Sequence, residues 1–209
     1  MITTAGLAPV ALGTVMSVSA AIDLREASRI LVYGVTGSGK STMAARISSS
    51  TGIPWYSVDD LTWEPGWTEV AVDEQRRRIE AICHRDEWIL DSAYSKWLDI
   101  PFSRVDLIIG LDYARWRSFG RLCRRTFIRI VDRTIVCNGN RESLRNAFSK
   151  DSLFIWHFTS FKRKRQRIQG WQADPAAPAV QRIRSPREMR RLLPDVVIAP
   201  PAQPSILPT

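Results

Sequence analysis

Cysteine, histidine and long hydrophobic segments are all scarce in this chain of 209 residues. The three cysteines, Cys83, Cys123 and Cys137, lie far apart and form no CxxC pair. This spacing excludes a disulfide framework and a zinc finger, and it favours a reducing, cytoplasmic compartment. The chain has only two histidines, His84 and His157, which argues against a histidine-based metal site. No internal repeat is present, so repeat architectures are excluded as well.

One uncharged segment, residues 5–22, has the length of a membrane span, but its composition argues against that role. It is rich in Gly, Ala, Ser, Thr and Pro, and it lacks the basic flank that a signal peptide has. We therefore predict that residues 1–24 form a flexible tail, or that translation starts at Met16. A protein tethered to a membrane by residues 5–22 is the disfavoured alternative. Residues 200–209 are a Pro-rich tail that cannot join a central strand. Residues 25–199 are expected to form a single domain.

Acidic residues are nearly absent from residues 113–170, which hold 15 Lys or Arg and only three Asp or Glu. Residues 1–112 hold 10 basic and 15 acidic residues, and residues 171–209 hold five and three. The net charge of +9 therefore arises from one segment of about sixty residues. Such a concentration of positive charge needs either an anionic partner or a solvated surface.

Strand-like and helix-like patterns alternate along the chain. Apolar runs typical of buried strands occur at 29–34, 53–58, 87–90 and 106–111. Helices are expected at 40–50, 70–85, 114–131, 152–169 and 186–193. This alternation predicts an α/β fold with a parallel five-stranded sheet, and the uniformly apolar strands predict a three-layer sandwich with both faces covered. The fifth strand falls at 179–184 or at 195–199, and periodicity leaves both open.

The segment Gly34-Val-Thr-Gly-Ser-Gly-Lys40-Ser41 matches the complete GxxxxGK[ST] motif of the phosphate-binding loop (P-loop), between a predicted strand and a predicted helix. Its glycines let backbone N–H groups converge on phosphate oxygens, and the following helix N-terminus adds positive potential. Lys40 is expected to reach the β- and γ-phosphates of ATP, and Ser41 to ligate Mg²⁺. No guanine-reading NKxD motif is evident, although GTP stays open as donor. The predicted nucleotide-binding residues are Gly34, Thr36, Gly37, Ser38, Gly39, Lys40, Ser41 and Thr42.

Carboxylates stand just past the carboxyl ends of three predicted strands, where ligands bind in open α/β sheets. They are Asp59 and Asp60 after the second strand, Asp91 after the third and Asp112 after the fourth. Each can hold Mg²⁺, accept the proton of an attacking hydroxyl, or merely cap the next helix or turn. Asp59 and Asp91 rank first, because we expect their strands to flank the strand before the loop. The predicted metal ligands are therefore Ser41, Asp59 and Asp91.

Four stretches of sequence together resemble a known family. They are LVYGVTGSGKSTMAARIS, IPWYSVDDLTWEPGW, EWILDSAYS and RVDLIIGLDYARW. They are similar to small P-loop kinase-like proteins known as topology modulation proteins or adenylate-kinase-related kinases, over roughly residues 29–193. Trp63-x-Pro-Gly-Trp67 is the most family-specific part. The resemblance implies a nucleoside-monophosphate-kinase-like fold with a basic helical lid, here residues 113–178, and it implies no particular substrate.

The chain departs from this family after its third strand. Members usually carry Asp-Gly-Asn-Tyr there, whereas this chain has Asp91-Ser-Ala-Tyr94. A backbone or amide contact made through that glycine and asparagine is therefore not carried over.

Arginines gather on one face of the predicted helix 114–131, at spacings of three and four residues. In phosphoryl transfer such side chains neutralise the charge that builds on the transferred group; a solvated surface is the alternative. The opposite face is apolar and is expected to dock on the sheet or on the second helix. The arginines are Arg117, Arg121, Arg124 and Arg125, and the apolar residues are Trp116, Phe119, Cys123, Phe127 and Ile130. A second basic run, Lys162–Arg165 with Arg167, reads as a solvated face, a nucleic-acid patch or a lid tip.

Aromatic residues cluster around Asp59 and can either stack on a flat acceptor or fill the core. We assign Trp55 to the core, and Trp63 and Trp67 to the pocket lining. Tyr94 and Arg117 complete the candidate acceptor contacts.

Together these features predict a phosphotransferase that moves the γ-phosphoryl group of Mg·ATP to a small acceptor, such as a nucleotide or metabolite. Its predicted catalytic residues are Lys40, Asp59, Arg121, Arg124 and Arg125. The alternative is a nucleic-acid-associated P-loop NTPase or regulator of DNA topology that uses the basic segment. The position of that segment inside the predicted fold, and the lack of a nucleic-acid-reading module, favour the kinase.

Overall fold

The computed structural model describes Leu24, residues 26–141 and residues 153–193. The predicted tails at 1–23 and 200–209, and the alternative last strand at 195–199, lie outside these residues. Within the described ranges, no helix is both long enough and apolar enough to cross a membrane.

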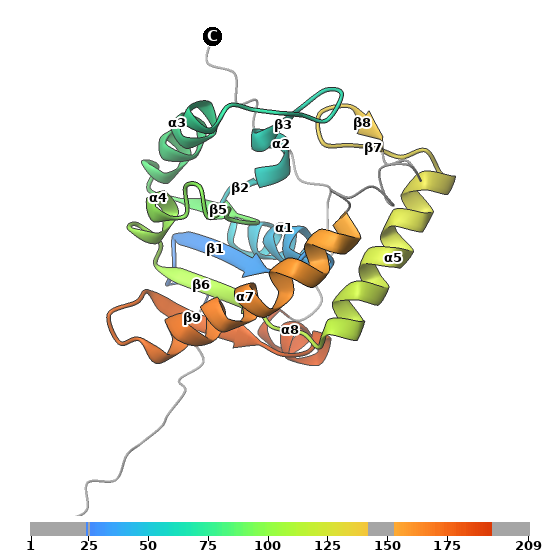
Figure 1. Cartoon of the computed structure of the whole chain (residues 1–209). Helices are drawn as coiled ribbons and strands as arrows, with labels where there is room; N and C mark the ends of the chain where they lie inside the picture. Colours follow the sequence, from blue (N-terminus) through green and yellow to red (C-terminus); the bar gives the residue numbers. More distant parts are fainter. Residues whose placement is uncertain (1–23, 25, 142–152, 194–209) are drawn as a thin grey trace, which may run out of the picture.

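The central sheet has five strands, and every neighbouring pair runs parallel. The order across the sheet is β2-β5-β1-β6-β9. In chain order the strands are β1 (Arg29–Gly34), β2 (Trp55–Tyr56), β5 (Trp88–Leu90), β6 (Leu107–Leu111) and β9 (Ala179–Ile183). The predicted parallel five-stranded sheet is confirmed, and its fifth strand is the one predicted at 179–184. Figure 1 shows the sheet at the centre of the molecule.

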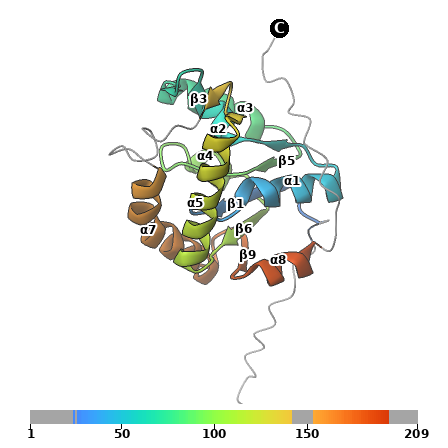
Figure 2. The ribbon, with the colours of Figure 1, turned by 90° about the vertical axis from the view of Figure 1, so that its right-hand side faces the viewer.

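Helices cover both faces of this sheet, which confirms the three-layer sandwich (Figures 1 and 2). One face packs against α1 (Lys40–Thr51) and α8 (Pro186–Leu192). The other packs against α3 (Val72–Cys83), α4 (Asp99–Phe102) and α7 (Leu153–Ala173). Side chains from β1 enter both cores: Ile30 and Val32 point to the first, and Leu31 and Tyr33 to the second. This alternation along a strand buried on both faces explains its uniformly apolar sequence.

The strand order corrects one expectation. The strands that flank β1 are β5 and β6, whereas β2 pairs only with β5, so the prediction that the strand before Asp59 flanks the loop strand was wrong. The regular strand is also shorter than the predicted 53–58, with two residues. Pro54 lies directly before it and has no N–H to donate, which suits the edge of a sheet rather than its centre. Asp91 and Asp112 follow the flanking strands instead.

Two short antiparallel hairpins and two further helices complete the described fold. The hairpins were not predicted. They are β3–β4 (Trp63–Glu64 and Thr68–Glu69) and β7–β8 (Ile135–Val136 and Asn140–Arg141). The helices are α2 (Val58–Thr62) and α5 (Arg115–Val131).

The face by which α5 docks differs from the expected one. Its buried residues are Ser118, Leu122 and Thr126, whereas Trp116 and Phe127 are 70% and 68% exposed. The prediction that these two aromatics dock on the sheet or on the second helix was therefore wrong. The reason is the close approach of α5 to the phosphate loop: a Cβ at Gly37 would lie 2.3 Å from the Ser118 carbonyl oxygen. The face of α5 that carries Ser118 and Leu122 therefore packs against the loop, and the side chains of Trp116 and Phe127 are left on the outside. Phe119 does reach α7, where it packs against Phe154, His157 and Phe158.

Candidate active site

The loop between β1 and α1 has the backbone that the phosphate-binding motif requires. Gly37 and Gly39 adopt φ values of 79° and 93°, in the left-handed region that favours glycine. Gly39 is the N-cap of α1, and the Ser38 N–H donates to the Val35 carbonyl at 3.2 Å. A Cβ at Gly34 would lie 2.9 Å from the Leu111 carbonyl oxygen of β6. The loop is therefore held in one shape by its own turn, by β6 and by α5.

Lys40 opens α1 and folds back over the loop. Its ammonium group donates to the Val35 carbonyl at 3.3 Å. Burial lowers the pKa of Lys40, Asp91 and Asp59 raise it, and Arg125 lowers it further. The lysine and these two carboxylates thus share one electrostatic environment. At the start of the same helix, Ser41 and Thr42 are exposed to solvent.

Asp91 lies at the carboxyl end of β5, buried beside the loop with a relative exposure of 5%. Its Oδ1 accepts a hydrogen bond from the Val58 N–H at 2.9 Å. Burial, with the Asp59 carboxylate as the next cause, raises the pKa of Asp91 to about 6, although the hydrogen bonds from Ser41 and the Val58 N–H and the charge of Lys40 oppose this shift. The structure therefore places Ser41 within hydrogen-bond reach of Asp91, and Asp59 close enough to Asp91 to act on its charge.

The burial of Asp91 predicts how the free energy of unfolding depends on pH. A carboxyl group whose pKa is 3.8 unfolded and about 6 folded makes the protein less stable as the pH rises through that interval, by about 3 kcal/mol in all. Asp91→Asn keeps an oxygen for the Val58 N–H but removes the charge. In the absence of Mg²⁺ we expect this variant to be more stable than the wild type by about 1–3 kcal/mol at about pH 7.5, and no more stable at about pH 3. Urea unfolding at the two pH values measures this, and a loss of stability at about pH 7.5 would contradict it.

Asp59 lies in the first turn of α2 and is exposed, in contrast to Asp91. The Tyr94 hydroxyl donates to its Oδ1 at 2.9 Å. Burial and the Asp59 carboxylate raise the pKa of Tyr94, so that its hydroxyl keeps the proton it donates. One oxygen of Asp59 is thus oriented by Tyr94, while the residue remains accessible from solvent.

The β3–β4 hairpin follows α2 and carries the two tryptophans of the WEPGW segment. Trp63 and Trp67 are half-buried and meet edge to face, with ring centroids 6.0 Å apart. Trp55, in contrast, is a core residue, as expected. Trp67 has a φ of 57°, so the turn holds a bulky residue in an unfavourable conformation.

Two asparagines of the β7–β8 hairpin bind the β3–β4 side of the site. The Asn138 amide donates to the carbonyls of Asp60 and Trp63, at 2.7 and 2.8 Å. The buried Asn140 side chain accepts from the Trp67 N–H at 2.8 Å, which holds the strained turn in place. The hairpin after α5 is therefore docked on the segment that carries Asp59.

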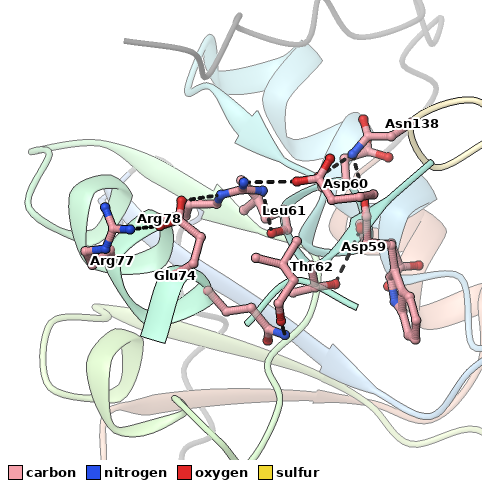
Figure 3. A network of polar contacts seen from close by, with 12 residues as sticks. Asp59, Asp60, Leu61, Thr62, Glu74, Arg77, Arg78 and Asn138 are labelled. Carbon is pink, nitrogen blue, oxygen red and sulfur yellow. Dashed lines mark hydrogen bonds and ion pairs between the residues drawn. The ribbon is translucent and has the colours of Figure 1, made fainter. Parts of the chain in front are cut away.

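The segment from Asp59 to Thr62 is also tied to α3. Arg78 donates to Glu74 at 2.8 Å, to Glu64 at 3.0 Å and to the Leu61 carbonyl at 3.2 Å. Figure 3 shows how this network and Asn138 hold the two sides of α2. Asp59 is thus carried by a rigid support rather than by a free loop.

Of the four predicted arginines of α5, the structure brings two to the phosphate loop. Arg121 Nη1 lies 3.4 Å from the Ser38 carbonyl, and the guanidinium stacks over the Tyr113 ring. Arg125 is close enough to Lys40 to lower its pKa. Arg124 is exposed, and Arg117 stacks over the exposed ring of Trp116. Arg121 and Arg125 are one helical turn apart and therefore share a face.

Asp112 has a different environment from the other carboxylates. It is buried at the end of β6, where Arg182 Nε donates to its Oδ2 at 2.8 Å and Arg165 Nε lies 3.3 Å from its Oδ1. These pairs join β6, α7 and β9. Asp112 therefore has a structural explanation that needs no ligand.

Sequence reasoning did not find every residue that the structure brings to this site. The buried His157 ring on α7 donates through Nδ1 to the Thr36 carbonyl of the loop at 3.0 Å. Lys164 on the same helix reaches the Gly34 carbonyl. Cys137 lies close to Asp59 and Asp60, and burial, together with these carboxylates, raises its pKa. A signal for Lys164 does exist, because Phe161, Lys164 and Ile168 follow the three- and four-residue spacing of a buried helix face.

The donor set suits Mg²⁺ bound together with a nucleotide rather than a permanent metal centre. Among the described residues, no three His, Cys, Asp or Glu side chains are grouped to hold a metal ion. Mg²⁺ in kinase-type sites needs only one or two carboxylates, with phosphate oxygens and water filling the other positions. Ser41 and Asp91 meet that requirement.

Comparison with known proteins gives structural neighbours but no family. No family model and no curated protein sequence matches the chain. A gluconokinase from Sinorhizobium meliloti has 16% identity and a TM-score of 0.45, with 79% of this chain and 89% of that chain covered. A sugar kinase from a Janibacter species has 18% identity and a TM-score of 0.46, with 78% and 88% covered. At these values we take neither a substrate nor a residue role from them, and the resemblance to topology modulation proteins stays a prediction.

Proposed function

We propose that the protein is a phosphotransferase that moves the γ-phosphoryl group of Mg·ATP to a small acceptor. The observation that carries this proposal is the convergence of Lys40, Asp91 and Asp59 on a glycine-shaped phosphate loop. The loop N–H groups and the N-terminus of α1 bind the phosphates. Lys40 shifts from the Val35 carbonyl to the β- and γ-phosphates, where its charge offsets theirs.

Ser41 and Asp91 are the residues we propose to hold Mg²⁺, with Asp59 contributing directly or through water. When bound there, the metal would supply positive charge that offsets the negative charge of the phosphates and of the transferred group. Asp91 must give up its proton to bind the metal, because only the ionised carboxylate is a ligand. Because burial raises its pKa, we expect metal binding to weaken as the pH falls below neutral.

Asp59 is the group we propose to receive the proton of the attacking hydroxyl. It is exposed, it is oriented by Tyr94, and it shares the environment of Lys40. Trp63 and Trp67 stand on the adjacent hairpin, where they would line the acceptor. Arg121 and Arg125 from α5 would stabilise the transferring phosphoryl group, and the docked β7–β8 hairpin would help to exclude water.

We do not extend this proposal to nucleic acid, because three of the five bases in the run 162–167 are engaged within the fold. Lys164 binds the Gly34 carbonyl, Arg165 pairs with Asp112, and Arg167 donates to the Tyr33 hydroxyl. A run of this kind is not a free basic surface.

A screen for ATP consumption against nucleosides, nucleotides, sugars and other small metabolites, with GTP as second donor, tests the proposal. We expect one class of acceptor to raise ATP turnover well above the rate with water alone, and ³¹P NMR to show the phosphorylated product. Failure of the purified protein to bind either nucleotide in calorimetry would overturn the proposal.

A further inference from the structure

Two lysines from distant parts of the chain reach adjacent carbonyls of the phosphate loop. Lys40 of the motif donates to the Val35 carbonyl at 3.3 Å, and Lys164 of α7 donates to the Gly34 carbonyl at 3.2 Å. The second of these is not part of the sequence motif. α7 is therefore connected to the loop through an ammonium group as well as through apolar packing.

Lys164 is buried to an unusual degree for a lysine, with 6% of its surface exposed. Its ammonium lies 5.4 Å from the centre of the Tyr33 ring. Tyr33, Tyr56 and Val58 belong to the core on the same face of the sheet, the face from which α2 and Asp59 continue. Lys164 therefore contacts the face of the sheet from which α2 continues, and Asp59 on α2 is close enough to act on its charge.

The charges around Lys164 are mostly positive. Lys40, Arg163 and Arg167 act on it as like charges, and Asp59 is the nearby carboxylate that opposes them. Arg165 and Asp112 line a small cavity with it, but Asp112 is paired with Arg182 and Arg165. Within the described part of the chain, the ion pairs found do not include a partner for Lys164. A buried ammonium that feels a second lysine as a like charge, and that is not in an ion pair of its own, costs stability unless an anion joins it.

We propose that Lys164 is a second phosphate-binding lysine, which joins Lys40 in binding the terminal phosphate of the nucleotide. The inference rests on the proposed function. On binding, the ammonium exchanges the neutral Gly34 carbonyl for a charged phosphate oxygen, as Lys40 does with the Val35 carbonyl. The ammonium thereby gains the attraction of an opposite charge, which the neutral carbonyl does not supply.

This role is distinguishable from that of a lysine that only tethers α7 to the loop. A tether would affect unfolding and not the binding of phosphate. A phosphate-binding lysine must also respond to the bound charge through its proton. Burial, with Lys40 as the next cause, lowers the pKa of Lys164 to about 7, and a phosphate beside it raises that pKa again. At about pH 8, where nucleotide phosphates are fully ionised, binding should therefore take up a proton at this side chain.

Titration calorimetry with Mg·ATP, at about pH 8 in two buffers of different ionisation enthalpy, tests the inference. We expect Lys164→Met to weaken ATP binding by about 10- to 100-fold and to reduce the proton uptake of the wild type. Lys164→Arg should restore most of the affinity without the proton uptake, because an arginine stays charged at every pH of interest. Lys162→Met, an exposed lysine on the same helix, is the matched control and should bind as the wild type does.

The outcomes separate the inference from the proposed function. A wild type that does not bind Mg·ATP would overturn both. A wild type that binds, with Lys164→Met binding equally well and taking up as many protons, would overturn the inference alone. Thermal unfolding of each variant without ligand checks that the fold is kept, and inorganic tripolyphosphate as second probe shows whether the effect belongs to the phosphates rather than to the base.

Discussion

Replacing Lys40 by alanine is expected to weaken Mg·ATP binding by at least about 100-fold and to abolish measurable turnover. We expect the ammonium to bind the phosphates both in the complex with ATP and during phosphoryl transfer. Each hydrogen bond from a charged group contributes about 1.5–3 kcal/mol. Two such bonds, to the β- and γ-phosphates, account for a loss of about 10²- to 10⁴-fold. Titration calorimetry measures the affinity, and the acceptor found in the screen measures the turnover.

The Lys40→Ala variant is expected to keep its fold. Among the residues that the structure describes, Lys40 donates to the Val35 carbonyl alone, and burial disfavours its charged form. Its removal therefore should not weaken the fold, and unfolding of Lys40→Ala should occur at or above the wild-type temperature. Lys162→Ala changes the same charge at an exposed position and should bind ATP normally. Equal affinity of Lys40→Ala and the wild type would show that the loop is not a nucleotide site.

The phosphate loop and the regular elements were predictable from the sequence because their determinants are local. Glycines at 37 and 39 adopt the left-handed conformations that the motif needs. The motif itself occurs between a strand and a helix, so it predicts the elements on either side of it. Apolar runs of four to six residues marked the sheet strands for the same reason. The strand 179–183 was found as one of two alternatives, because an apolar pattern says that a strand is buried and not where it pairs.

The strand order and the docking faces were not predictable, because they depend on contacts between distant residues. The sequence around Asp59 does not show that β5 lies between β2 and β1 in the sheet. The aromatic side of α5 has the pattern of a buried face, yet the steric demand of Gly37 places Ser118 and Leu122 there instead. The same limit applies to Asn140, which holds a turn 73 residues earlier in the chain.

Charge patterns were the least informative, because a run of bases does not show which members face inward. Lys164 and Arg165 are neighbours in the sequence, yet one is buried beside the loop and the other is exposed and pairs with Asp112. In the same way, Asp91 and Asp112 both end strands that flank β1. Arg182 and Arg165 pair with the second, whereas the first faces Ser41 and Lys40. Position at a strand end identifies candidates, and the partners decide among them.

Arg121→Ala is expected to lower turnover with the best acceptor by about 10³-fold while ATP binding changes little. The guanidinium lies over the loop, 3.4 Å from the Ser38 carbonyl, and stacks on Tyr113, which keeps it at the mouth of the site. An arginine that offsets charge developing on the transferred phosphoryl acts mainly in the transition state, and removing such a group costs about 10³-fold or more. Because such a group binds the transition state more strongly than the ground state, the affinity for ATP should be nearly preserved.

The matched control is Arg190→Ala. Arg190 is an exposed arginine on α8, which packs on the face of the sheet opposite to α7, so this variant should leave turnover unchanged.

The same pair of variants distinguishes a kinase from a nucleic-acid-binding protein. If Arg121 gripped a phosphate backbone, duplex affinity would fall with salt, with a slope near −0.9 per contact, and Arg121→Ala would reduce that slope. We expect weak duplex binding in both proteins and a loss confined to kcat. Tight duplex binding that disappears in Arg121→Ala, with ATP turnover intact, would refute the assignment of this arginine to phosphoryl transfer and would favour a nucleic-acid partner for the basic segment.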